Sequence, residues 1–214
     1  REDRNRVGEA ISSFIRILEF ARDTGIRLIY ASSSSIYNGN PIPWREDMPI
    51  YPTDFYTEAR YSMERLASVY HQFYGVQSVG LRQFSVYGKN EEAKGKFANL
   101  ITQMIWAKER NEIFEIYGDG EQKRDVISVS DVVDAYLLAM NSSIECDVFN
   151  VGTGKSHSVN EMARMIGTQI KYTPNPLKNY VQDTLADTSR AETLLGFKAK
   201  ITTFLSAGKS RTER

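Results

Sequence analysis

Hydroxyl groups, a phenol and a fixed positive charge occur in this chain at spacings that suit proton transfer. A run of serines, residues 32–35, ends a short apolar segment, and Tyr56 and Arg60 follow on one predicted helix. Residues four apart share a helix face, so the guanidinium lies beside the phenol and favours its phenolate form. A serine hydroxyl at the strand end can hold a substrate oxygen while the phenol exchanges its proton. A tyrosine and an arginine at this spacing also fit an ordinary solvated helix face, so the serines carry much of the argument.

The composition excludes several classes of protein. Among the 214 residues, Lys plus Arg and Asp plus Glu both number 27, and a net charge of zero argues against nucleic acid as a partner. The single cysteine, Cys146, excludes an internal disulfide and is expected to be a buried structural thiol in a reducing compartment. No apolar run approaches the roughly 18 residues of a membrane span, and the charged first residues are unlike a signal peptide. We expect a cytoplasmic protein without a membrane or nucleic-acid partner.

Amphipathic helices alternate with short apolar strands along the chain. Periodicity and capping signals predict helices over residues 8–23, 55–73, 97–107 and 131–141, and another from 158 onward. Short apolar runs predict strands over residues 26–31, 76–81, 113–117, 126–129 and 148–151. This alternation indicates an α/β fold with a parallel sheet. Thr53 or Asp54 is expected to cap the second helix, and Asp131 to cap the fourth.

Further motifs follow in a fixed order. They are Ile36-Tyr37, the segment from Leu81-Arg82 to Gly88, Tyr117-Gly118-Asp119-Gly120 with Arg124-Asp125, Asp131-Val132-Val133, and Phe149-Asn150-Val151-Gly152-Thr153-Gly154. With the serine run and the Tyr56–Arg60 pair, this order resembles the extended short-chain dehydrogenase/reductase family. The most similar branch is that of the NAD-dependent nucleotide-sugar epimerases, of the UDP-glucose 4-epimerase type. The resemblance covers about residues 8–205.

The resemblance implies a particular domain organisation. It predicts the C-terminal portion of a Rossmann-like parallel sheet, incomplete here, with a smaller substrate-binding lobe. Residues 1–84 and 125–150 are assigned to what remains of the NAD-binding domain, and residues 85–124 and 151–214 to the sugar-nucleotide-binding lobe. The family grips the dinucleotide on a Gly-x-x-Gly-x-x-Gly turn, and these 214 residues contain none. The chain is therefore expected to be a fragment, an incomplete gene product, or a sequence without its N-terminal half, inactive until that half is supplied.

The resemblance also assigns catalytic and cofactor-binding residues. The family's catalytic serine or threonine maps to Ser33, its tyrosine to Tyr56, and its lysine to Arg60. Ser32 is expected to touch the nicotinamide, and Tyr56 and Arg60 to lie against the ribose beside it. Arginine keeps the charge of lysine but is bulkier and forks its donors, so the replacement is not conservative.

Substrate contacts are implied at five positions. These are Ser34, Ser85, Asn99, Arg124 and Lys178. Ser85 stands where the family usually has asparagine, Asn99 lies where the family grips the uridine, and Lys178 lies near a second phosphate-binding arginine of the family. Arg124 matches the arginine that reaches the diphosphate, a bidentate task suited to guanidinium.

Alternatives remain open at several of these positions. Arg124 also fits a surface arginine that pairs with Asp119 or Asp125. No metal site is expected, because His71 and His157 lie far apart without ligand spacing.

The resemblance implies a nucleotide-sugar 4-epimerase that uses NAD and a UDP-sugar, works through a 4-keto intermediate, and forms a homodimer. Dehydratases and decarboxylases of the family carry acidic residues where this chain has Ser34 and Ser35, so epimerisation is preferred. A 4-reductase or dehydratase is one alternative. A non-catalytic remnant that binds sugar nucleotides or dimerises is another.

Overall fold

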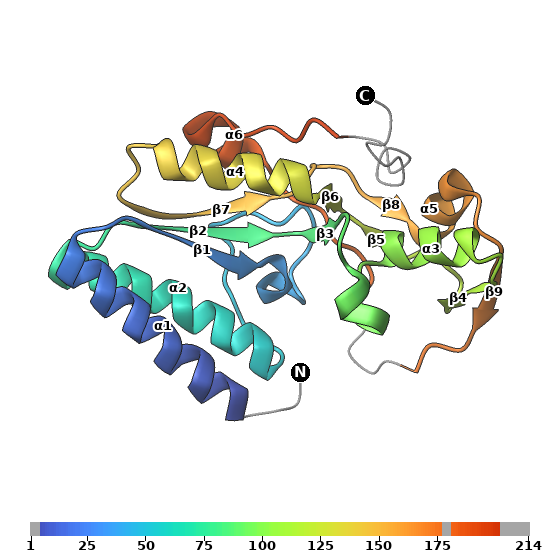
Figure 1. Cartoon of the computed structure of the whole chain (residues 1–214), viewed down its shortest axis with the longest axis horizontal. Coiled ribbons are helices and arrows are strands. Elements are labelled where there is room, and N and C mark those ends of the chain that lie inside the picture. The colour runs from blue at the N-terminus through green and yellow to red at the C-terminus, as the bar shows by residue number, and fades with distance from the viewer. Residues whose placement is uncertain (1–4, 177–180, 202–214) are drawn as a thin grey trace.

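A parallel sheet of three strands forms the centre of the protein, which is known from a computed structural model that describes residues 5–176 and 181–201. The strands pair in the order β1-β2-β7. Their bounds are Leu28–Ser33 for β1, Ser78–Gln83 for β2 and Cys146–Val151 for β7. Helices cover both faces of the sheet, so the predicted α/β fold is confirmed (Figure 1).

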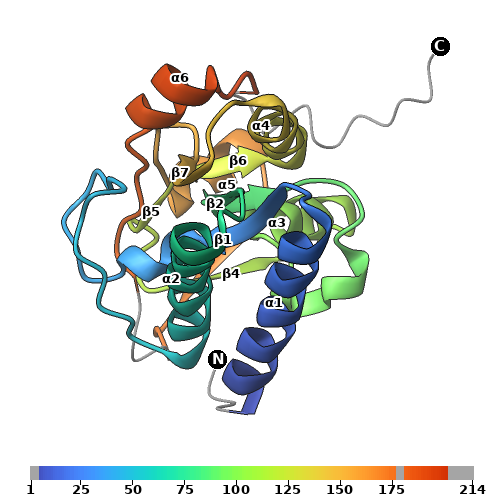
Figure 2. The ribbon, with the colours of Figure 1, turned by 90° about the vertical axis from the view of Figure 1, so that its left-hand side faces the viewer.

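Two long helices cover one face of the sheet, and two others lie on the opposite face (Figure 1). The first two are α1, Asn5–Thr24, and α2, Phe55–Tyr74, which lie side by side (Figure 2). The others are α4, Val129–Asn141, and α6, Ser189–Leu195. An apolar core that includes Leu81 and Phe149 fills the space between the sheet and α4 and α6.

Local signals fix where α2 begins and ends. Asp54 accepts a hydrogen bond from the Thr57 N–H, and the Thr57 hydroxyl accepts one from the Asp54 N–H, which makes a capping box. At the other end Gly75 adopts φ 69°, a left-handed conformation that favours glycine and stops the helix. The capping box fixes the first turn of α2, where Tyr56 lies.

A second group of elements packs beside the sheet. Its helical segments are η2, Glu92–Phe97, a short 3-10 helix, then α3, Leu100–Glu109, and α5, Val159–Ile166. Its strands are β3, Ser85–Tyr87; β4, Phe114–Tyr117; β5, Lys123–Arg124; β6, Val126–Ser128; β8, His157–Ser158; and β9, Ile170–Thr173. They pair two by two, as β3-β6, β4-β9 and β5-β8. A separate apolar core joins α3 and α5 to β4.

The structure differs from the sequence predictions in a few places. The strands β1 and β2 both extend two residues further than predicted, because polar residues at their ends still pair in the ladder. The third helix begins at Leu100, after η2, instead of residue 97. Asp131 does not cap α4: Ser128 does, and the Asp131 carboxylate instead accepts the N–H groups of Lys200 and Ile201.

The described residues contain neither a membrane-spanning helix nor a cluster of metal ligands. No helix within residues 5–176 and 181–201 is long and apolar enough to cross a bilayer. The same residues contain no group of three or more His, Cys, Asp or Glu side chains placed to hold a metal ion.

Close packing of β1 against β2 makes Gly80 a sensitive position. A Cβ atom there would lie 2.7 Å from the ring of Tyr30, which is buried. We expect Gly80→Ala to lower the free energy of unfolding by about 1–3 kcal/mol. Gly8→Ala is the matched control, since nothing lies within 4 Å of its Cβ, and in helix α1 it should add about 0.5–1 kcal/mol. Urea denaturation measures both, and equal effects would contradict the packing described.

Candidate active site

A row of polar side chains crosses the sheet one residue before the ends of β1 and β2. Ser32 pairs in register with Arg82, and Arg82 with Asn150 on β7. All three are buried, Asn150 completely. Buried polar groups are costly unless they are hydrogen-bonded, so this row needs partners from the surrounding elements.

Glu64 of α2 supplies the main partner. Its carboxylate forms a two-point ion pair with Arg82, at 3.0 Å from Nε to Oε1 and 2.7 Å from Nη2 to Oε2. The Ser32 hydroxyl also donates to Glu64 Oε1, the oxygen that accepts from Arg82 Nε. Both side chains of the pair are about 5% exposed or less. The pair therefore fastens the middle of α2 to β1 and β2 at a fixed register.

The network continues into the segment that follows the serine run. Arg82 donates to the hydroxyl of Tyr37, at the end of the 3-10 helix η1, Ser34–Tyr37. Tyr37 in turn donates to the side-chain oxygen of Asn150, at 2.8 Å. Burial raises the pKa of the Tyr37 phenol, which keeps it protonated and able to donate. The chain after Ser33 is thus held in place by the same network as α2.

Ser33 lies on the opposite face of the sheet. Its register partner is Gln83, whose amide donates to the hydroxyl of Tyr136 on α4, at 2.9 Å. Ser33 caps η1, and its hydroxyl lies 2.9 Å from that of Ser35. Ser32 is therefore buried with its hydroxyl donating to Glu64, whereas Ser33 is half-buried. The expected contact of Ser32 with a nicotinamide stays a prediction.

Tyr56 and Arg60 lie together at the end of β1. The guanidinium carbon is 5.2 Å from the centre of the tyrosine ring, a cation–π contact that confirms the predicted shared face. Arg60 also donates to the carbonyl of Ala31, two residues before Ser33, at 3.0 Å. The ring is not packed in the interior, since Tyr56 is 37% exposed. Both side chains line an apolar groove of about 360 Å³ between α1 and α2.

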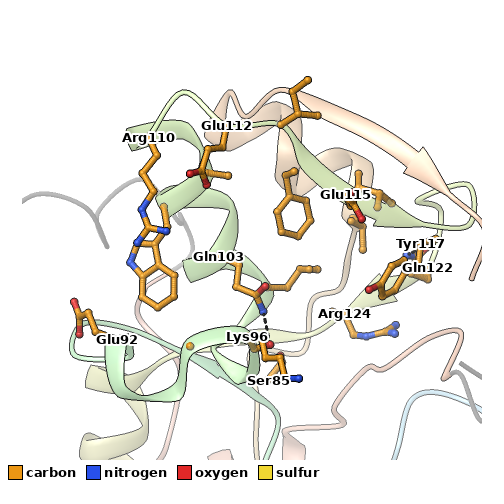
Figure 3. Close-up of a pocket in the computed structure, with 18 residues that line it drawn as sticks. Ser85, Glu92, Lys96, Gln103, Arg110, Glu112, Glu115, Tyr117, Gln122 and Arg124 are labelled. Carbon is orange, nitrogen blue, oxygen red and sulfur yellow. Dashed lines mark hydrogen bonds between the residues drawn. The ribbon is translucent and has the colours of Figure 1, made fainter. Parts of the chain in front are cut away.

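A larger cavity of about 850 Å³ lies in the second group of elements. Figure 3 shows it between α3 and β4, with Arg124, Tyr117 and Gln122 on one side and Arg110 and Glu112 on the other. The Arg124 guanidinium is fixed by the carbonyls of Lys123, Val181 and Gln182, at 2.7 to 2.9 Å. These bonds occupy both Nη1 and Nη2 with backbone carbonyls, while Arg124 still lines the cavity.

The structure brings some predicted substrate residues together and separates others. Ser85 lines the same cavity as Arg124, and the Asn99 amide donates to the Ser85 hydroxyl at 2.8 Å. Asn99 also caps α3. Ser34 lies with Ser33 at the end of β1, outside the residues that line this cavity. Lys178 lies outside the described residues.

A buried carboxylate supports the wall beside Arg124. Asp125 accepts hydrogen bonds from the N–H groups of Thr153, Gly154 and Ala186, and from the Thr153 hydroxyl. Burial raises the pKa of Asp125, and these four donors act against that rise. The Gly152-Thr153-Gly154 turn therefore directs two of its N–H groups at a carboxylate of the protein.

Sequence reasoning missed the residues that hold the site together. Glu64 was not singled out, and Arg82 and Asn150 were noted only as parts of motifs. A signal was present, since Arg82 directly follows the apolar run Val79-Gly80-Leu81 and Asn150 lies between Phe149 and Val151. A buried strand carries a charged residue only with a partner, but nothing in the sequence identifies Glu64 among the chain's acidic residues.

Comparison with known proteins identifies the family to which the chain belongs. The family model described as the NAD dependent epimerase/dehydratase family matches residues 5–152. A putative UDP-glucose 4-epimerase of Methanocaldococcus jannaschii is 35% identical over 195 residues, which are 87% of this chain and 63% of that protein. The chain therefore belongs to the NAD-dependent epimerase/dehydratase family, and it spans less than two thirds of this curated relative.

Solved structures show the same fold. UDP-glucose 4-epimerase of Thermotoga maritima with UDP-glucose matches with a TM-score of 0.86 at 28% identity, over 94% of this chain and 67% of that one. UDP-N-acetylglucosamine 4-epimerase of Methanobrevibacter ruminantium, in complex with UDP-N-acetylmuramic acid, matches with a TM-score of 0.85 at 29% identity, over 92% and 65%. The Rossmann-like arrangement expected from the sequence is confirmed by these matches.

The four hydrogen bonds that the Asp125 carboxylate accepts give a testable prediction. Asp125→Asn replaces an acceptor oxygen by an NH2 group that faces backbone donors, so at least one buried N–H loses its partner. We expect the free energy of unfolding to fall by about 2–3 kcal/mol. Asp119→Asn is the control, since Asp119 is exposed and its carboxylate accepts a single hydrogen bond within the described residues, from the Glu121 N–H. It should change stability by about 0.5 kcal/mol or less. Thermal and urea denaturation measure the difference. If Asp125→Asn left the free energy of unfolding unchanged, these hydrogen bonds would not be important for stability.

Proposed function

We propose that this chain is the catalytic and sugar-nucleotide-binding part of an NAD-dependent nucleotide-sugar 4-epimerase. The observation that carries the proposal is the position of Arg60. It stacks on Tyr56 and bonds the Ala31 carbonyl. A phenol and a guanidinium are thereby held at the strand end that presents Ser33. That is the set of groups that proton transfer at a sugar hydroxyl requires.

The described residues fit one end of the cofactor. Tyr56 and Arg60 are partly exposed at the carboxyl end of β1, where ligands bind in open α/β sheets. They would hold the ribose next to the nicotinamide, while the glycine-rich turn for the pyrophosphate does not occur in this sequence. When bound, NAD supplies the acceptor and donor of hydride at sugar C4.

The protein residues then handle the proton and the sugar. Ser33 orients and polarises the C4 oxygen, and Tyr56 accepts the hydroxyl proton beside the fixed charge of Arg60. The 4-keto sugar rotates, and Tyr56 returns the proton when the opposite face is reduced. Ser34 and Ser35 offer no carboxylate for elimination, which favours epimerisation over dehydration.

The larger cavity, lined by Arg124 and Ser85, is the proposed sugar-nucleotide site. Arg124 would bind the diphosphate, with Ser85 and Asn99 beside it, and a UDP-sugar is the proposed substrate. The relatives of known structure named above were solved with UDP-glucose and UDP-N-acetylmuramic acid. On this proposal the core between α3 and α5 belongs to the substrate lobe, and the core between the sheet and α4 to the NAD-binding domain.

A second candidate function has one observation in its favour. Tyr56 and Arg60 line a different cavity from Arg124 and Ser85 in this chain. A protein that only binds sugar nucleotides would need the larger cavity and not the groove that Tyr56 and Arg60 line. The proposed homodimer fits both candidates, because α1 and α2 expose apolar side chains. They include Ile17, Phe20, Val69 and Phe73.

The enzymatic proposal is tested by completing the chain. When it is joined to the third of the Thermotoga maritima enzyme that it does not cover, we expect interconversion of UDP-glucose and UDP-galactose with NAD. Tyr56→Phe should lower kcat by about 10²- to 10⁴-fold with UDP-glucose affinity unchanged, because it removes only the proton acceptor. Tyr51→Phe is the matched control, since Tyr51 is 72% exposed and lines neither cavity.

Two results would contradict the enzymatic proposal. One is a completed protein that binds both NAD and UDP-glucose without turnover, which would favour the binding-protein alternative. The other is full activity in Tyr56→Phe.

A further inference from the structure

A buried carboxylate secures one wall of the larger cavity. Glu91, which is 4% exposed, accepts hydrogen bonds from the Asn99 N–H at 3.1 Å and from the Thr102 hydroxyl, and it pairs with Lys94 at 2.8 Å. Burial alone would raise the pKa of Glu91, but the bonds from Lys94, Thr102 and Asn99 keep that pKa below its usual value. The carboxylate is thus ionised at neutral pH and clamps η2 to the start of α3.

The two lysines of η2 point in different directions. Gly95 lies between them with φ 51° and ψ −123°, a conformation that favours glycine and kinks η2. Lys94 turns back to Glu91, whereas Lys96 lines the cavity. Gln103 of α3 donates to the carbonyl of Lys96 at 3.3 Å, which holds that end of η2 against the helix.

The ammonium of Lys96 is not neutralised by any carboxylate in residues 5–176 and 181–201. The Lys96 Nζ atom lies 5.3 Å from the centre of the Phe97 ring, and Phe97 is 80% exposed. Figure 3 draws Lys96 and Ser85 on the same side of the cavity as Arg124, away from Arg110 and Glu112. Glu115, another carboxylate of the lining, already pairs with Lys171 at 2.7 Å.

We propose that Lys96 is a second diphosphate-binding cation, which acts with Arg124 and Ser85, and that Glu91 and Thr102 are positioning residues for it. The inference deepens the proposed function, because the ligand class is the diphosphate of a nucleoside-diphosphate sugar. It assigns to Lys96 the task that sequence reasoning gave to Lys178.

Calorimetric titration of the chain with UDP and UDP-glucose, and NMR titration with uridine, test the assignment. In Lys96→Ala the Kd for UDP should rise about five- to tenfold, while that for uridine stays unchanged, since only a charge-assisted phosphate contact is lost. The UDP defect should shrink at high salt. Lys89→Ala removes the same charge from an exposed position outside the cavity lining and should bind UDP normally.

The positioning role is tested at Thr102. Thr102→Val removes the hydroxyl that Glu91 accepts and should reproduce the loss of UDP affinity, with faster hydrogen exchange in residues 92–97. Thr102→Ser keeps the hydroxyl and should restore both. If Val and Ser behave alike, the positioning role is wrong.

The outcomes separate the two proposals. If the wild-type chain binds UDP and Lys96→Ala matches Lys89→Ala, the inference is overturned and the proposed function stands. If Lys178→Ala alone weakens UDP binding, the second cation is Lys178. If the wild-type chain binds neither UDP nor UDP-glucose, the inference fails together with the proposed substrate.

Discussion

The buried ion pair between Glu64 and Arg82 is the interaction on which the candidate active site depends. It joins the middle of α2 to the sheet at one register, and α2 carries Arg60 about one turn and Tyr56 about two turns before Glu64. Sliding or rotating α2 would separate Tyr56 from the strand end and leave two charges buried without partners. Breaking such a pair costs about 3–5 kcal/mol, so the position of α2 is strongly determined.

The same pair organises the sheet into two chemically different faces. Ser32, Arg82 and Asn150 point toward α2 and satisfy one another through Glu64 and Tyr37. One residue later, Ser33 and Gln83 point the other way, because side chains alternate along a strand. Within the serine run, Ser32 is therefore bonded inside the fold, whereas Ser33 lies on the face where we propose that the substrate binds. The buried Ser32 hydroxyl is hydrogen-bonded to Glu64, the same carboxylate that pairs with Arg82.

The fold was largely predictable from the sequence, whereas the support of the site was not. The alternation of helices and strands, the α2 cap at Asp54 and the stop at Gly75 follow from local signals. The Tyr56–Arg60 contact follows from helix geometry. The partners of Arg82 and Asp125 come from residues 18 to 61 positions away, and no local rule selects them. Glu91 accepts from Thr102, which is 11 positions further along the chain. The same limit explains Asp131, whose carboxylate meets a segment near residue 200 instead of its own helix.

Coupling between Glu64 and Arg82 tests the account most directly. A double-mutant cycle would measure the free energy of unfolding for Glu64→Leu, Arg82→Met and the double variant. Each single change should cost about 3–5 kcal/mol because it strands the other charge, and the double variant should cost less than the sum by about 2 kcal/mol or more. Single changes that add within about 0.5 kcal/mol would show that the two residues act independently, and would contradict the claim that this pair holds α2 in place.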